Sequence, residues 1–261
     1  MIEPNSIIHG DCLEVMKDIA DKSIDCIICD LPYGITDSKW DSVIPFETLW
    51  EQYKRIIKPN GAIVLFGSQP FTSALVMSNP KWFKYEWIWD KKIPSGMSYA
   101  RYQPMRQHEN ILIFYNNKCI YNPQLVRRVS PIKGGGMTKG ESTKNQNLIP
   151  LHKTYDYKNP VSLICANKIR YGGQHPTQKP VPLLEYLIKT YTIEGELILD
   201  NTAGSGSLAI AAINTKRNYI CIEKDDHYFE VMKERIANHD PNAPVKKPKV
   251  KAEVKGQLVL F

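Results

Sequence analysis

The sequence lacks any long apolar run. None of its apolar stretches, over 261 residues, approaches the roughly 20 residues that a membrane-spanning helix needs. The first residues also lack the basic and then apolar pattern of a secretory signal peptide. We therefore expect a cytoplasmic protein with no part in a membrane.

Cysteine is also sparse, and the six cysteines are scattered. Only Cys26 and Cys29 are close enough to suggest a metal or redox pair. They fall in an expected strand, where an odd spacing points two side chains to opposite faces. Buried, reduced thiols fit better, as in a cytosolic protein. His175 has no partner at ligand spacing, so the sequence predicts no metal site.

Acidic residues are scarce in two segments of the chain. Residues 117–172 contain ten Lys or Arg and only two Asp or Glu, and the residues after Asp240 contain five Lys and one Glu. The whole chain carries a formal charge of +7, so the remainder is acidic. This concentration of positive charge favours a polyanionic partner such as DNA over a solvated loop that is basic by chance.

Apolar runs of strand length alternate with helical patterns on both sides of the basic segment. This order is typical of an α/β sheet with helices on both faces. A hydrophobic content of 43% allows one large domain with an insertion, or two small domains. We expect strands at residues 6–11, 23–28, 62–66, 85–90, 110–115, 196–200 and 218–223, and helices at 12–19, 46–57, 71–77, 180–191, 208–214 and 225–237.

The stretch Asp30-Leu31-Pro32-Tyr33 follows the strand at residues 23–28. Ligand sites in α/β sheets lie beyond the carboxyl ends of the strands. A carboxylate, a backbone carbonyl and an aromatic ring held together there suit activation of the exocyclic amine of a planar base. Two acceptors would hold its hydrogens while Tyr33 stacks on the ring. The alternative is an ordinary turn that ends a strand.

Acidic residues end three other expected strands. Asp11 is placed either to accept hydrogen bonds from an adenosine or to cap the helix that follows it. Asp200 precedes a turn that contains Gly204 and Gly206, and Glu223 ends the next strand. A strand, a Gly-x-Gly turn, a helix and a second strand ending in an acid form half of a nucleotide-binding sheet.

These motifs resemble those of the DNA methyltransferases that use S-adenosylmethionine to methylate base amines. Residues 30–33 are similar to the Asp-Pro-Pro-Tyr catalytic motif of this family, and residues 200–207 to its Asp-Pro-Phe-x-Gly-Ser-Gly-Thr cofactor loop. Residues 175–180 match the segment that precedes that loop. The order, with the catalytic motif first, is that of the family's β group, which implies a circularly permuted Rossmann-like methyltransferase sheet with an inserted target-recognition region.

The resemblance implies a role for each matched residue. Asp30, Leu31, Pro32 and Tyr33 would hold the flipped-out base and its amine. The cofactor would bind Asp11, Thr177, Lys179, Asp200, Ala203, Gly204, Gly206 and Glu223, with Thr177 and Lys179 at its methionine end. Within the basic segment we expect Arg127, Arg128, Lys133, Lys139 and Lys144 to contact double-stranded DNA.

Two departures from the family pattern stand out. Leu31 replaces a proline but keeps its carbonyl, and Asn201-Thr202 replaces Pro-Phe. A leading Asp in the catalytic motif favours adenine N6 over cytosine N4, where family members more often carry Ser. The alternatives are the same chemistry on cytosine, on RNA or on a glutamine amide, and a DNA-binding protein without catalysis. A nicotinamide dehydrogenase is a weaker one, because the turn after Asp200 has no third glycine.

The chain ends in Gln257-Leu258-Val259-Leu260-Phe261 after a Lys- and Pro-rich stretch that is typical of a flexible linker. These residues either form a last strand on the protein's own sheet or resemble the peptide by which bacterial DNA enzymes attach to the replication sliding clamp. In the second case Gln257, Leu258, Leu260 and Phe261 would bind the partner. The predicted organisation is a catalytic half at 1–116, a target-recognition insert at 117–172, a cofactor-binding half at 173–239 and a basic tail at 240–261.

Overall fold

The computed structural model describes residues 2–34, 41–133, 154–168, 178–241 and 258–260. The chain divides into two compact units. The larger unit joins Met1–Asn122 to Ser162–Phe261, and the smaller unit is Pro123–Val161. None of the helices in these residues is long and apolar enough to cross a membrane.

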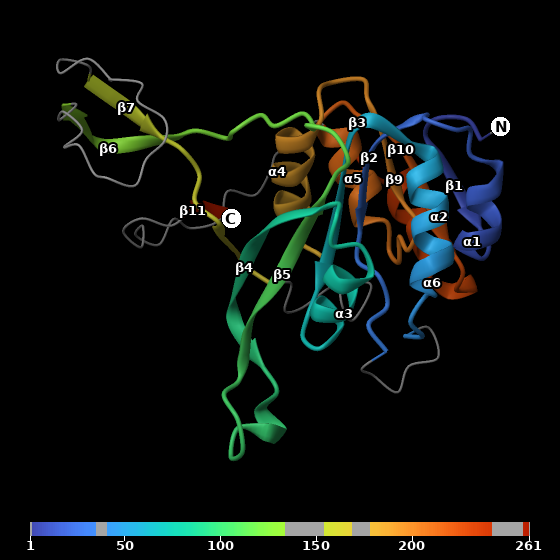
Figure 1. Cartoon of the computed structure of the whole chain (residues 1–261), viewed down its shortest axis with the longest axis horizontal. Helices are drawn as coiled ribbons and strands as arrows, with labels where there is room; N and C mark the ends of the chain where they lie inside the picture. The colour runs from blue at the N-terminus through green and yellow to red at the C-terminus, as the bar shows by residue number, and fades with distance from the viewer. Residues whose placement is uncertain (1, 35–40, 134–153, 169–177, 242–257, 261) are drawn as a thin grey trace. The chain divides into compact units, whose positions relative to one another are not determined.

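Strands from both halves of the chain form one mixed sheet in the larger unit (Figure 1). Its order, over the described residues, is β1-β10-β9-β2-β3-β5-β4-β8-β11. The strands are β1 (Ser6–His9), β2 (Ile24–Cys29), β3 (Ile57–Gly67), β4 (Phe83–Ser95), β5 (Arg106–Phe114), β8 (Leu163–Ala166), β9 (Leu197–Asp200), β10 (Asn218–Glu223) and β11 (Leu258–Leu260).

Helices cover both faces of this sheet, as the sequence predicted. They are α1 (Cys12–Val15), the 3₁₀ turn η1 (Met16–Asp18), α2 (Phe46–Ile56), α3 (Phe71–Ser78), α4 (Val181–Tyr191), α5 (Ser207–Asn214) and α6 (Asp226–Ala237). One apolar core packs α1, α2 and α3 on one face, and a second packs α4, α5 and α6 on the other. Burial on both faces explains why the central strands read as continuous apolar runs.

Strands β9 and β10 come from the C-terminal half of the chain, but in the sheet they lie between β1 and β2 from the N-terminal half. All four strands are parallel, with Cys26 beside Ile198 and Ser6 beside Ile220. Their carboxyl ends therefore meet at one edge of the sheet, although their residues are far apart in the sequence. This is the permuted arrangement that the motif order implied.

Strand β2 shows why the two neighbouring cysteines do not pair. Cys26 belongs to the core on one face, and Cys29 to the core on the other. All six cysteines are buried and free. Burial raises the pKa of both thiols well above the ordinary value, so they stay protonated.

Three regions differ from the predictions. The helix expected at residues 12–19 is one α turn followed by a 3₁₀ turn. The strands expected at 85–90 and 110–115 are longer and form a hairpin whose tip projects past the neighbouring strands (Figure 1). Leu163–Ala166, which we expected outside the sheet, forms β8 beside β4, because its apolar side chains are buried there.

The C-terminal residues Leu258–Leu260 form a parallel strand on β8, with Val259 beside Cys165. The structure thus has the arrangement in which the tail completes the protein's own sheet. Gln257 and Phe261 lie outside the described residues. Attachment to a sliding clamp stays a prediction, and it would require this strand to leave β8.

The smaller unit contains β6 (Val126–Lys133) and β7 (Thr154–Lys158), an antiparallel pair. Arg127 and Lys133 are exposed on β6, and Arg128 donates a hydrogen bond to the Tyr157 carbonyl at 3.2 Å. Lys139 and Lys144 lie outside the described residues. The unit begins later and ends earlier than the predicted insert, whose boundaries stay a prediction.

Candidate active site

A pocket of about 780 Å³ opens at the carboxyl ends of β1, β2, β9 and β10. This volume lies in the upper part of the range for small-molecule and cofactor sites. Most of the predicted site residues line it: Asp11, Asp30, Leu31, Pro32, Tyr33, Lys179, Asp200, Ala203, Gly204 and Glu223. Gly206 starts α5 behind the loop, and Thr177 lies outside the described residues.

Asp30 lies at the end of β2 and is held by two donors. The Tyr33 hydroxyl donates to Oδ1 at 2.6 Å, and the Lys179 ammonium donates to Oδ2 at 2.5 Å. Each carboxylate oxygen has a second lone pair, so both bonds leave acceptor capacity toward the pocket. Burial alone would lower the pKa of Lys179, but Asp30 and Glu109 outweigh it and raise that pKa. Lys179 is therefore charged. Burial, together with the charge of Glu109, raises the pKa of Asp30 above its ordinary value, and the charge and hydrogen bond of Lys179 oppose that rise.

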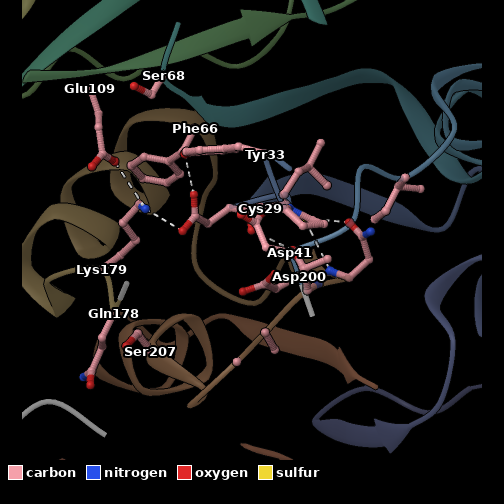
Figure 2. Close-up of a pocket in the computed structure, with 18 of the residues that line it drawn as sticks. Cys29, Tyr33, Asp41, Phe66, Ser68, Glu109, Gln178, Lys179, Asp200 and Ser207 are labelled. Carbon is pink, nitrogen blue, oxygen red and sulfur yellow. Dashed lines mark hydrogen bonds and ion pairs between the residues drawn. The ribbon is translucent and has the colours of Figure 1, made fainter. Parts of the chain in front are cut away.

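Glu109 and Lys91 extend this ion pair into the protein. The Lys179 ammonium lies 3.3 Å from Oε2 of Glu109 (Figure 2). The Lys91 ammonium lies 3.2 Å from Oε1 of the same carboxylate. The Lys179 ammonium also lies 5.0 Å from the centre of the Phe66 ring. Burial alone would raise the pKa of Glu109, but the two lysines lower it. Two cations and two anions thus alternate in one chain, which lessens the cost of burying them.

The sequence analysis assigned Lys179 to the methionine end of the cofactor and did not single out Glu109 or Lys91. In the structure Lys179 lines the pocket and contacts Asp30, and its contact with the cofactor stays a prediction. The sequence signal for Glu109 was an acidic residue directly before the buried residues of β5. Its partners were not predictable, because Lys91 and Lys179 are distant in the sequence and meet Glu109 only in the folded protein.

Tyr33 packs against an aromatic neighbour as well as bonding to Asp30. Its ring stacks on Phe71 of α3, with centroids 4.9 Å apart and planes at 30°. Burial raises the pKa of its hydroxyl well above the ordinary value, so the hydroxyl remains a donor. Leu31 is buried in the core that contains α1, α2 and α3. These contacts fix the turn that follows β2 on both sides of Pro32.

Asn201 and Thr202, which replace Pro-Phe of the family motif, link the loop after β9 to the loop after β2. The Asn201 amide oxygen accepts from the Tyr53 hydroxyl at 2.6 Å and from the Cys29 thiol at 2.8 Å. The Thr202 hydroxyl donates to the Asp30 carbonyl at 3.1 Å. This departure from the family pattern therefore supplies a cross-link between the carboxyl ends of β2 and β9.

Glu223 organises the glycine turn from the end of β10. One carboxylate oxygen accepts from the Gly204 amide at 2.6 Å, and the other accepts from the amides of Lys224 and Asp225 at 2.9 and 2.8 Å. Asp11 caps α1 by accepting from Leu13 at 3.0 Å, and it pairs with Lys224 at 2.9 Å. Asp11 therefore caps α1, as one interpretation predicted, and it also lines the pocket, where it could accept hydrogen bonds from an adenosine.

Gly206 must be glycine for two reasons. Its φ of +74° is left-handed, and an added Cβ would lie 2.6 Å from Met232 Cγ of α6. We expect Gly206→Ala to lower the free energy of unfolding by about 2 to 4 kcal/mol, the cost of strain plus overpacking. Gly195→Ala is the matched control, since Gly195 has a φ of +85° and no atom within 4 Å of the added Cβ. Urea denaturation that shows equal losses for the two variants would contradict this account of the turn.

Asp200 is buried just before the glycine turn, and it accepts a hydrogen bond from the Thr202 amide at 3.1 Å. Burial, together with the carboxylates of Asp30 and Glu223, raises the pKa of Asp200 to about 7. A folded pKa above the unfolded value means that the folded state binds the extra proton. Stability from this group is therefore lost as pH rises from about 4 to about 7.

Asp200→Asn removes this titration. We expect the unliganded variant to gain roughly 2 to 3 kcal/mol relative to the parent protein between about pH 5 and about pH 8. Thermal melts of both proteins at the two pH values measure the change. A stability difference that is the same at both pH values would show that Asp200 is already ionised at the lower one.

Within the described residues, no group of three or more His, Cys, Asp or Glu side chains is arranged to hold a metal ion. The carboxylates of the pocket are acceptors for hydrogen-bond donors. Asp11, Asp200 and Glu223 form an acidic end, and Asp30 with Tyr33 lies at the other motif. These acceptors fit the hydroxyls and amines of a nucleoside.

Comparison with known proteins agrees with this geometry. A sequence model of the DNA methylase family matches residues 24–234. Type II methyltransferase M.HinfI of Haemophilus influenzae is 27% identical over 91% of this chain and 70% of its own length. Type II methyltransferase M2.MboI of Moraxella bovis is 26% identical over 97% of this chain and 94% of its own length.

Solved structures show the same fold. The M1.HpyAVI–SAM complex has a TM-score of 0.59 at 25% identity and covers 88% of this chain and 98% of its own. The PvuII DNA methyltransferase, which is cytosine-N4-specific, has a TM-score of 0.63 at 15% identity. The match covers 92% of this chain and 90% of that protein's chain. The match to the family covers most of the chain and includes both loops of the pocket, so this chain belongs to the DNA methylase family.

Proposed function

We propose that this DNA methyltransferase transfers a methyl group from S-adenosylmethionine to the N6 amine of adenine in double-stranded DNA. The observation that carries the proposal is the joining of two loops in one pocket. Asp30 and Tyr33 lie at one loop, and Asp200 and Glu223 lie at the other. The similarity to the M1.HpyAVI–SAM complex supports the choice of cofactor.

The residues at the acidic end fit the cofactor. Asp11, Asp200 and Glu223 would accept hydrogen bonds from its adenosine and its ammonium group, and Ala203 with Gly204 would let it approach the backbone. Gly206 would hold the turn, and Thr177 would lie next to the pocket segment at 178–179. Bound there, S-adenosylmethionine supplies an electrophilic methyl group on a sulfonium.

The other end fits the base. The target amine is a poor nucleophile because its lone pair is delocalised into the ring. The Asp30 carboxylate and the Leu31 carbonyl would accept its two hydrogens and favour the pyramidal, nucleophilic form. The Tyr33 ring would stack on the flipped base, and Pro32 fixes the backbone between them. Because Leu31 contributes a carbonyl, its side chain does not compromise this chemistry.

The ion-pair chain gives Asp30 its protonation state. Lys179, held by Glu109, would keep Asp30 ionised and ready to accept. Attack by the amine leaves one proton too many on the product nitrogen, and Asp30 is the acceptor placed beside it. Rotation of the base out of the duplex costs a few kcal/mol, roughly, and alignment of amine and methyl group supplies much of the acceleration.

The basic strand β6 is the candidate for target recognition. Arg127, Arg128 and Lys133 would contact phosphate or base edges, together with Lys139 and Lys144. Phosphate contacts make binding depend on salt, with a loss of affinity for each cation removed. These roles belong to the smaller unit, which corresponds to the central part of the predicted insert.

The adenine assignment depends on the leading Asp30, since relatives that act on cytosine N4 more often carry Ser there. Nucleoside mass spectrometry of DNA from a host without its own methyltransferases tests it. Expression of the chain should produce N6-methyladenine. N4-methylcytosine in its place would preserve the mechanism and contradict the choice of base.

A further inference from the structure

The tip of the β4–β5 hairpin, Gly96–Met105, is the most apolar exposed segment of the described chain. Twelve large apolar side chains are exposed, and five of them by more than 60%. Three of these five lie within six residues of the tip: Met97 at 73%, Tyr99 at 61% and Tyr102 at 85%. Clusters of this kind mark interaction surfaces.

The charge around the tip identifies the kind of partner. Residues 91–108 contain four Lys or Arg and no Asp or Glu. Lys91 and Lys92 are paired with Glu109 and Asp90, so their charges are largely compensated. Arg101 and Arg106 are exposed on either side of Tyr102. Aromatic rings interleaved with arginines fit nucleic acid, whose bases stack and whose phosphates attract cations.

The tip is also part of the pocket that holds Asp30. Tyr99, Gln103 and Arg106 line that pocket. Arg106 donates to the Ser68 hydroxyl at 3.2 Å, which ties the hairpin to the end of β3. The hairpin tip therefore borders the pocket in which the proposed base would bind.

Local hydrogen bonds hold the tip in one shape. The Tyr99 amide donates to the Gly96 carbonyl at 3.0 Å, and the Tyr102 amide donates to the Tyr99 carbonyl at 2.9 Å. At the root of the hairpin, Asp90 accepts from the Lys92 amide at 2.9 Å and from the Gln107 amide group at 3.0 Å. A backbone held by such turns loses less entropy on binding than a free loop would.

We propose that the hairpin tip enters DNA beside the target nucleotide, with Tyr102 filling the gap in the base stack and Arg101 contacting the phosphates. Proteins that distort duplexes insert apolar side chains between bases in this way. The inference rests on the proposed function, and it adds an element outside the predicted insert at 117–172. The basic strand β6 would then read the sequence, while the tip would stabilise the flipped state.

The test compares two duplexes that contain the sequence methylated by the parent protein. In one duplex the target base is paired, and in the other it faces an abasic site and needs no strand opening. We expect Tyr102→Ala to lower kcat/KM about tenfold or more on the paired duplex, because stacking on an aromatic ring is lost. On the abasic duplex the loss should be less than about twofold, since little unpairing energy is needed.

Two further variants separate stacking from other causes. Tyr102→Phe retains the ring and should retain the parent kcat/KM on both duplexes. Ile193→Ala removes an apolar side chain that is 54% exposed in the loop before β9, and it should change neither value. Equal losses for Tyr102→Ala on the two duplexes, or no loss on either, would overturn the inference. A parent protein that methylates no DNA sequence, so that neither duplex can be chosen, would overturn the proposed function instead.

Discussion

Asp30→Ala is expected to lower the rate of methyl transfer at least about 100-fold, the usual cost of removing one preorganised electrostatic contact. The variant loses the carboxylate that accepts a hydrogen of the target amine and then its surplus proton. Affinity for S-adenosylmethionine should change little, because Asp30 belongs to the base end of the pocket. Single-turnover rates and calorimetric titration with the cofactor measure the two quantities separately.

Asp30→Ala also deprives Lys179 of an ion-pair partner, so the stability of the variant must be measured as a control. Without Asp30, Lys179 keeps only Glu109 as an anionic partner. A fall in stability is therefore expected, and thermal melts must show that the variant is folded at the assay temperature. Glu230→Ala removes a carboxylate that is 67% exposed on α6, away from the residues that line the pocket, and should leave the rate unchanged. An Asp30→Ala rate within about fivefold of the parent's would contradict the assignment, since even modest general catalysis contributes more than that.

Lys179→Met should have the second largest effect, a loss of roughly 10- to 100-fold in kcat, with the cofactor affinity nearly unchanged because Lys179 acts through Asp30 and not on the cofactor. The substitution removes the cation between Asp30 and Glu109 and so raises the pKa of Asp30. Because the ionised form of Asp30 is the active one, the residual activity should rise toward higher pH than in the parent protein. The pH dependence of kcat measures this shift.

The same variant distinguishes two roles for Lys179. If Lys179 closed the methionine end of the cofactor, its loss would weaken S-adenosylmethionine binding and leave the pH profile in place. Lys189→Met is the matched control, since Lys189 is exposed near the end of α4. Breaking a buried ion pair costs about 3 to 5 kcal/mol of stability, so melts accompany the kinetics. An unshifted pH profile would mean that Lys179 does not set the charge of Asp30.

Local patterns in the sequence were sufficient to predict the central strands and the two loops of the site. Strand β2 is buried on both faces and therefore reads as an apolar run up to Asp30. The turn before α5 carries glycine because Gly206 is left-handed and abuts Met232. In both places the constraint acts within a few residues, so it leaves a readable pattern.

The parts that could not be predicted depend on contacts between distant segments. The chain from Asp30 through Lys179 to Glu109 joins positions that lie 70 residues apart or more. Likewise, Leu163–Ala166 is short and lies beside a basic region, and only its pairing with β4 reveals that it belongs to the main sheet. The tail offered two interpretations, and the pairing of β11 with β8 was not encoded in its own residues.

The central claim is that S-adenosylmethionine and a DNA base meet in the pocket of Asp30 and that the methyl group passes directly between them. A pulse-chase experiment tests it most directly. Protein preloaded with methyl-labelled cofactor is mixed with unmethylated DNA and an excess of unlabelled cofactor, and label is counted in DNA and in denatured protein. We expect the bound label to appear in DNA within one turnover and none to stay on the protein. Label that remains on denatured protein, or DNA that acquires none, would contradict direct transfer at this site.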